Sequence, residues 1–255
     1  YDYDVTFSQV SPYMQLETSP VEKLRVTAGL RFDVLGFDYE NNLADGAFQT
    51  SNGPVPPNAA RTFYRPGDQN VDYDKLSTSI GATWAFTPAL NGFLGYKESF
   101  RVPQEGQLFR QGANLDSTNL KPVKADSYEI GLRGTPAPTL SWELSAYTMT
   151  KRDDILTYND GSGPTQTNNG ETSHEGIEAA LGWQFLPEWR LDVAASRSQS
   201  EYEAWVAFVN GVNVDFSGNT MPSAPEHLGN VALGYAPDRL DGLSVEAELV
   251  YLGSY

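Results

Sequence analysis

The feature that most constrains the fold of this sequence is an alternation of apolar and polar side chains with a period of two residues. In LRVTAGLRFD (24–33), every second residue from leucine to phenylalanine is apolar, and arginine, threonine, glycine and aspartate occupy the positions between them. Successive side chains of a β-strand point to opposite faces of its sheet, so this period is typical of strands with one apolar face. The same alternation recurs in segments 76–86, 127–134, 140–147, 176–185 and 243–251. It predicts an all-β chain of about ten strands and no helix.

The connections between these strands are expected to be short at one end and long at the other. Tight turns are expected near five prolines: Pro20, Pro88, Pro138, Pro187 and Pro237. Between them lie four long connections rich in turn-forming residues: 39–72, 102–124, 157–172 and 203–225. A soluble β-sandwich has connections of similar length at both ends, whereas an outer-membrane barrel has short turns on one side and long loops on the other. The asymmetry favours an antiparallel up-and-down transmembrane β-barrel.

Aromatic side chains lie close to the short turns and support the same interpretation. They are Trp84, Trp142, Trp183, Trp189 and Tyr235. In a barrel these rings would lie at one height and form a belt at the boundary between hydrocarbon and water. The other face of the strands carries charged residues, which suit a polar interior. Charges facing water and tryptophans in a core would suit a sandwich, so the alternation alone leaves both folds open.

The composition excludes several classes of function. A formal net charge of −16 argues against a nucleic-acid partner, because binding to phosphates needs a basic face. The sequence has no cysteine, and its two histidines, His174 and His227, are far apart. We therefore expect no catalytic residues, no metal site and no cofactor. No apolar run is long enough for a membrane-spanning helix, and the first residues do not form a signal peptide.

Three segments of the sequence carry motifs in a recognisable order. YKESFRVPQEGQLFRQG (96–112) is followed by NLKPVKADSYEIGLRG (119–134), which gives the order Phe-Arg-x-Pro, Asn-x-Lys-Pro and Tyr-Glu-x-Gly. This order is similar to the C-terminal barrel half of the TonB-dependent outer-membrane receptor family. TNNGETSHEGIEAAL (167–181) is also similar. Further similar stretches begin at Ser11, Ala146 and Pro225, so the resemblance covers essentially all 255 residues.

The resemblance implies a barrel of about 22 strands that is plugged by a separate N-terminal domain. We expect residues 1–255 to be a partial barrel domain, a slice without the plug or the flanking strands; a closed ten-stranded barrel is the alternative. The resemblance also implies a place in the Gram-negative outer membrane and import driven by the TonB energy-coupling protein through the plug. The implied partners are a ferric siderophore or related nutrient, the plug, and outer-membrane lipid and lipopolysaccharide.

The connection at 102–124 contains the first group of candidate ligand-binding residues: Arg101, Gln104, Gln107, Phe109 and Arg110. Guanidinium groups suit the oxygen atoms of an anionic chelate, and an exposed ring would offer an apolar platform. The alternative is structural, with Arg101 and Pro103 fixing the corner between strand and loop and Arg101 paired with a carboxylate. Asp153 and Asp154 are adjacent on a strand, so they are expected to point to opposite faces rather than share a site.

A second group of candidate residues lies in the first long connection: Arg61, Phe63, Tyr64 and Arg65. The alternative there is a loop that folds on its own aromatic side chains. Asn210-Gly211 is a two-residue hairpin signal within 205–216. The function that the resemblance implies is active uptake of a ferric siderophore or similar bulky nutrient. A passive porin or structural barrel is the alternative, and a soluble β-sandwich binding module is a third.

Overall fold

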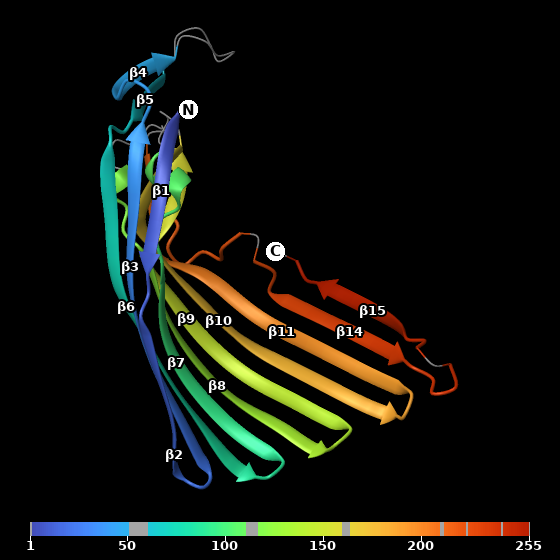
Figure 1. The fold of residues 1–255 in the computed structure, drawn as a ribbon. Coiled ribbons are helices and arrows are strands. Elements are labelled where there is room, and N and C mark those ends of the chain that lie inside the picture. The colour runs from blue at the N-terminus through green and yellow to red at the C-terminus, as the bar shows by residue number, and fades with distance from the viewer. Residues whose placement is uncertain are drawn as a thin grey trace.

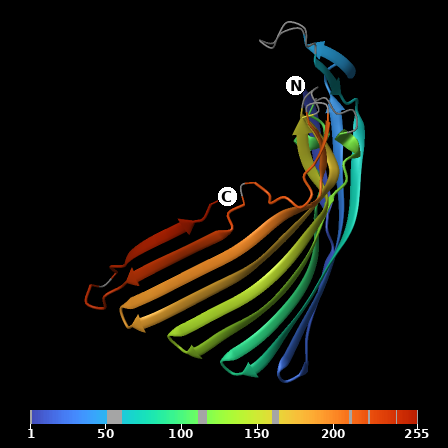
Figure 2. The same cartoon turned by 180° about the vertical axis from the view of Figure 1, so that it is seen from behind.

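The computed structural model describes residues 2–50, 61–110, 117–159, 164–209, 212–222, 224–240 and 242–254. Only the backbone is described for residues 48–50, 61–62, 158–159, 164–165 and 208. Most of this chain forms one curved antiparallel sheet that is a single layer thick (Figures 1 and 2). No described helix is long and apolar enough to cross a membrane.

The sheet has eleven strands in the order β1-β3-β6-β7-β8-β9-β10-β11-β14-β15, and β2 also pairs with β3. The strands are β1 (Tyr3–Val10), β2 (Tyr13–Val21), β3 (Leu24–Asn41), β6 (Gln69–Thr87), β7 (Leu90–Arg101), β8 (Val123–Ala137), β9 (Leu140–Asn159), β10 (Pro164–Leu186), β11 (Trp189–Ala204), β14 (His227–Tyr235) and β15 (Val245–Leu252). β1 pairs with the second half of β3 and β2 with the first half, so together they form one edge strand. Proline at position 12, which cannot donate a backbone hydrogen bond, lies at the break between them. Counted this way, ten strands cross the sheet, which confirms the predicted number.

The connections alternate between short and long, as predicted. Two-residue turns at 22–23, 88–89, 138–139 and 187–188 join four hairpins at one end of the sheet, the lower end in Figure 1. The β3–β6 connection at the other end contains the hairpin of β4 (Gly46–Thr50) and β5 (Arg61–Arg65). The β11–β14 connection contains the hairpin of β12 (Val206–Val209) and β13 (Val212–Asp215), which confirms the predicted hairpin although residues 210–211 themselves lie outside the described chain.

Three details of the connections were predicted wrongly. The tight turn expected near Pro237 is a longer connection, because β14 ends at Tyr235 and β15 begins only at Val245. The expected long connection at 157–172 is mostly strand, because β9 continues to Asn159 and β10 starts at Pro164. Both ends are polar on both faces, so they show no apolar alternation although they pair as strands. The β7–β8 connection contains one turn of helix, α1 (Glu105–Leu108), and a 3₁₀ turn, η1 (Ser117–Asn119), where no helix was predicted.

The outer, convex face of the sheet is apolar and uncovered. Leu30, Ile80, Leu94 and Ile130 are between 44% and 63% exposed, and no second sheet packs on them within the described residues. A sandwich would bury this face against a partner sheet. The single layer therefore excludes the sandwich and agrees with a wall whose apolar face contacts lipid.

The apolar face changes sides towards the long-loop end. In β3, apolar side chains occupy even positions over 24–34 and odd positions over 35–39, where they are buried on the inner face. In β6 they occupy odd positions over 71–73 and even positions over 76–86. The strand register places the two changes at the same height. Below this height the outer face is apolar, and above it the inner face is.

Three of the five aromatic residues predicted near the short turns, Trp183, Trp189 and Tyr235, form a contiguous row with Phe185. The Trp189 ring lies 4.5 Å from that of Tyr235 and 6.4 Å from that of Phe185, which in turn lies 5.6 Å from Trp183. These contacts join three adjacent strands at one height, which agrees with the predicted belt.

Candidate functional site

The core of the described chain lies on the inner face of the sheet at the long-loop end, where the β7–β8 loop folds back. This loop is described at 102–110 and 117–122. Its apolar residues pack against side chains from β3, β8 and β9 in a group we call the inner cluster: Phe37, Tyr39, Leu108, Phe109, Leu120, Val123 and Ile155. The loop is therefore held inside the curve of the sheet rather than projecting from its end.

Phe109 is the centre of the inner cluster, and the expectation that its ring is exposed was wrong. The ring is 1% exposed, stacks on Tyr39 at 4.6 Å between ring centres and meets Phe37 edge-on at 6.0 Å. Leu108 is fully buried beside it. Both residues thus anchor the loop, and neither offers an apolar platform to a ligand. The sequence alone does not reveal that these two side chains are buried, because their partners are far away along the chain.

Two tyrosine hydroxyls fix the same loop through hydrogen bonds. Tyr73 donates to the carbonyl oxygen of Leu120 at 2.8 Å, and Tyr3 donates to Glu105 Oε1. The bond to Glu105 raises the pKa of Tyr3 to about 12, and burial acts in the same direction. Burial raises the pKa of Tyr73 to about 12. Both hydroxyls stay neutral, and therefore remain donors, over the physiological range.

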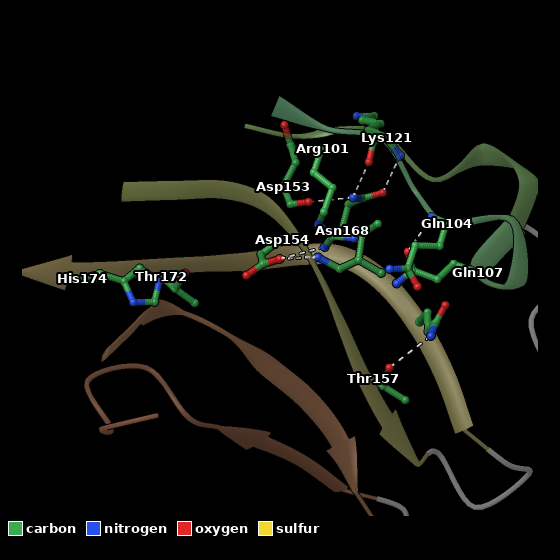
Figure 3. Close-up of polar contacts among 12 residues, drawn as sticks. Arg101, Gln104, Gln107, Lys121, Asp153, Asp154, Thr157, Asn168, Thr172 and His174 are labelled. Atoms are coloured by element: carbon green, nitrogen blue, oxygen red, sulfur yellow. Dashed lines mark hydrogen bonds and ion pairs between the residues drawn. The ribbon is translucent and has the colours of Figure 1, made fainter. Parts of the chain in front are cut away.

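Arg101 ends β7 and takes the structural place that was the alternative to ligand binding. Its guanidinium lies 3.8 Å from a carboxylate oxygen of Asp154 on β9, as Figure 3 shows. Asp153 forms a separate ion pair with Lys124 at 3.1 Å. The two neighbouring carboxylates therefore have different partners, as expected. Arg101 remains half exposed and can contact a ligand while it is paired.

Gln104 and Gln107 stabilise the start of α1. The backbone N–H of Gln104 donates to Oε1 of Gln107 at 2.8 Å, an interaction that satisfies a donor before the helical turn (Figure 3). Gln104 itself is exposed, and so is Arg110 at the other end of the turn. Arg110 lies close enough to Tyr3 for its charge to lower the tyrosine pKa against the larger effect of Glu105.

The second candidate group lies on the β4–β5 hairpin, which extends beyond the end of β3 and β6 (Figure 1). Phe63, Tyr64 and Arg65 are partly buried, and the side chain of Arg61 lies outside the described part of the chain. Arg65 Nη1 donates to the carbonyl oxygen of Ala44 at 2.6 Å, a bond that closes the base of the hairpin.

Tyr39 links the two candidate groups. Its ring stacks on Phe109, and the charge of Arg65 acts on its hydroxyl, lowering a pKa that burial raises. The structure therefore brings Arg65 and the β7–β8 loop to the same end of the inner face.

The strand ends contribute one further residue that the sequence pattern does not indicate. Asn168 on β10 forms three hydrogen bonds to the backbone of Lys121 and Asp153 and lies between them in Figure 3. It belongs to the TNNGETSHEG stretch that marked the family resemblance, but nothing local in that stretch identifies its partners.

The lower inner face of the sheet is polar and charged. Arg190 forms an ion pair with Asp192 at 2.6 Å, and Arg133 lies 5.5 Å over the ring of Phe93. A hollow of about 590 Å³ follows this wall and is lined by polar groups that include Glu143 and Asn230. Within the described ranges, no three histidine, aspartate or glutamate side chains gather in an arrangement that could hold a metal ion.

These features together define a class of protein. A single-layer sheet with an apolar outer face, a charged inner face and long loops at one end is the wall of an outer-membrane β-barrel. The sequence profile described as "TonB dependent receptor-like, beta-barrel" matches residues 1–255, and the chain belongs to this family of Gram-negative outer-membrane proteins.

A curated relative and two solved structures give the extent of the similarity. An uncharacterised TonB-dependent receptor of Haemophilus influenzae is 24% identical over 250 residues, which cover 95% of this chain and 63% of the relative. The chain thus spans less than two thirds of that protein.

The siderophore receptor PiuA from Acinetobacter baumannii aligns with a TM-score of 0.72 and 20% identity over 98% of this chain and 34% of its own. The closed form of the ferric-catecholate import receptor Fiu from Escherichia coli K12 aligns with a TM-score of 0.69 and 19% identity over 98% of this chain and 35% of its own. At these identities the alignments establish a shared fold.

Proposed function

We propose that this chain is part of an active-transport receptor that binds a ferric siderophore or a similar bulky nutrient and imports it with energy from the TonB complex. Membership of the TonB-dependent receptor family supports the transport class. Similarity to receptors named for siderophores and ferric catecholates supports the class of cargo. The proposed cycle is binding and gated passage, with no covalent chemistry.

The observation that carries the proposal is the position of the β7–β8 loop. The inner cluster holds the loop against the inner face, and Arg101, Gln104 and Arg110 remain exposed on or beside the loop. A loop held in place by its own core presents these groups at small conformational cost, which favours specific binding.

The proposed ligand contacts divide into two roles. Arg101, Gln104 and Arg110 would meet the cargo, because guanidinium and amide donors suit the oxygen atoms of an anionic chelate. Tyr64 and Arg65 would contribute from the β4–β5 hairpin. The remaining candidates on the loop, Phe109 and Gln107, would support these contacts from beneath.

The edges of the sheet support the proposal that further strands and a plug complete the barrel. The sheet order ends at β1 and β2 on one side and at β15 on the other. Unpaired backbone groups at such edges are costly in hydrocarbon, so neighbouring strands have to satisfy them. The charged inner wall is the surface that a plug would contact, and TonB would act through that plug.

Growth and uptake assays on a strain that lacks the full-length protein test the proposed function. The strain is supplied with a panel of ferric chelates as its only iron source, with and without a functional TonB protein. We expect loss of growth and of radiolabelled iron uptake on one chelate or a few related ones, and the same loss when TonB is absent. Uptake that continues without TonB would support the passive porin instead.

The proposed contacts are tested by Gln104→Ala together with Arg110→Ala in the full-length receptor. We expect a loss of affinity of about tenfold or more for the chelate identified by growth, because hydrogen bonds to charged groups contribute about 1.5–3 kcal/mol each. Asn230→Ala, on the distant β14, is the matched control and should bind normally. Unchanged affinity in the double variant would remove this loop from the site.

A further inference from the structure

Two adjacent asparagines on β10 each bind a different loop at the long-loop end of the sheet. The side chain of Asn168 pairs with the β7–β8 loop: its Oδ1 accepts from the N–H of Lys121 at 2.7 Å and its Nδ2 donates to the Lys121 carbonyl oxygen at 2.9 Å. Asn169 Nδ2 donates to the carbonyl oxygen of Val206 at 3.1 Å, at the start of β12 in the β11–β14 loop.

Adjacent strand residues normally point to opposite faces of the sheet. A β-bulge at Asn168 and Asn169 frees these two residues from that rule, so that each can bind a loop at the same end of the sheet. Thr167 pairs with Leu156 and Gly170 with Asp154, so β10 advances three residues while β9 advances two. Asn168 and Asn169 thus share one partner position, which releases both from the regular alternation. Bulges commonly redirect side chains in this way.

The partner strand contains a matching irregularity that Asn168 also holds. Between Gly170 and Thr172 the extra residue lies on β9, where Asp153 has a φ of 56°. This is a left-handed conformation that residues other than glycine rarely adopt. The carbonyl oxygen of Asp153 accepts a second hydrogen bond from Asn168 Nδ2, at 2.7 Å. Asn168 therefore connects the β7–β8 loop to the irregularity on β9.

Gly170 lets the two strands approach closely at this point. A Cβ atom there would lie 2.4 Å from Leu156 Cδ1 and 3.2 Å from the carbonyl oxygen of Asp154. The bulge thus depends on close backbone packing as well as on the asparagine, as expected for a built feature of the strand pair.

We propose that Asn168 and Asn169 form a double clamp that sets the positions of the β7–β8 and β11–β14 loops together, with Asn168 as the controlling member. The hydrogen bond from Asn168 to Asp153 ties the β10 bulge to the irregularity on β9, and the β10 bulge in turn sets the direction of Asn169. Loss of Asn168 should therefore loosen both loops, whereas loss of Asn169 should loosen only the β11–β14 loop. The role of the clamp in capture of a ligand rests on the proposed function, but its mechanical effect does not.

Hydrogen–deuterium exchange on the full-length protein in detergent or nanodiscs tests the clamp without any ligand. Asn168→Ala should raise exchange about tenfold or more in peptides covering 117–122 and also in those covering 205–209, since several hydrogen bonds are lost. Asn169→Ala should raise exchange by a smaller factor, and in 205–209 alone. Asn230→Ala removes a side-chain amide bonded to Glu248 on β15 and is the control that should change neither region.

A conservative variant separates the clamp from a general loss of folding. Asn168→Asp keeps the acceptor for Lys121 N–H and loses both donated bonds, so its exchange should lie between that of the wild type and that of Asn168→Ala. Exchange in the β10–β11 hairpin near 180–195 should stay unchanged in every variant. The clamp is refuted if Asn168→Ala affects only 117–122, or if both alanine variants behave alike. Because no cargo is present, failure here leaves the transport proposal standing.

Discussion

Phe109 is the residue on which the position of the β7–β8 loop depends most. It occurs between Leu108 and Arg110 in an otherwise polar segment, where an exposed ring would be the simplest expectation. Instead its ring stacks on Tyr39 and closes the inner cluster. This contact fixes the loop against β3.

Phe109→Ala should detach the loop from the inner face. Removal of a buried phenylalanine ring costs about 3–5 kcal/mol, and here the cost falls on the docked state of the loop. Exchange in 102–110 should rise strongly, while the strands keep their protection. Phe32→Ala, which removes a ring from the exposed outer face, should leave the loop unchanged. Equal effects of the two variants would show that Phe109 is not the anchor.

The two tyrosine hydroxyls make docking of the loop sensitive to strongly alkaline pH. The pKa values of Tyr3 and Tyr73 are raised to about 12, from about 10 in an unfolded chain. Because the docked state favours the neutral hydroxyl, the contribution of each tyrosine to docking is fully present below about pH 10. This contribution is lost as the pH rises through about 12. In an absorbance titration of the folded protein, Tyr73→Phe should remove one late-titrating tyrosine. A change that appears instead near pH 10 would contradict the assigned environment.

At the scale of the elements, alternation predicted the strands where lipid makes one face apolar, and it failed where a strand pair is built mainly from polar residues. β3 and β6 were predictable for this reason, and so were the short turns. The upper ends of β9 and β10 were not, because they are held by backbone pairing between polar residues. The partners of Phe109 and Asn168 could not be predicted either, because they depend on the fold of the β7–β8 loop and on strand irregularities that no local sequence pattern shows.

The two faces of β6 should differ in their tolerance of charge. Ile80→Arg, on the exposed apolar face, should lower the free energy of unfolding by about 2–4 kcal/mol in a bilayer, because the guanidinium would enter hydrocarbon. Ser79→Arg, one residue away on the inner face, should have a much smaller effect. Equilibrium unfolding of the full-length protein in lipid vesicles measures both variants. Similar losses at the two positions would contradict the assignment of the faces.

At the scale of the whole molecule, the change of apolar face in β3 and β6 marks the outer limit of the hydrocarbon layer. Below it the wall is apolar outside and charged inside, as a transport barrel requires. Above it the inner face is apolar and the β7–β8 loop packs against it, and the inner cluster lies entirely in this part. The same strands thus serve first as membrane wall and then as the support of the loops.

The central claim is that the outer face of these strands contacts lipid and the inner face does not. Since the chain has no cysteine, single cysteines can be placed along 71–86 of β6 without background and labelled with nitroxide probes in vesicles. We predict that lipid-soluble oxygen reaches the even positions from 76 to 86. A water-soluble nickel complex should reach the odd positions from 77 to 83. Positions 71 and 73 should be shielded from both reagents. Uniform accessibility along the strand, or access of the nickel complex to the even positions, would contradict the account.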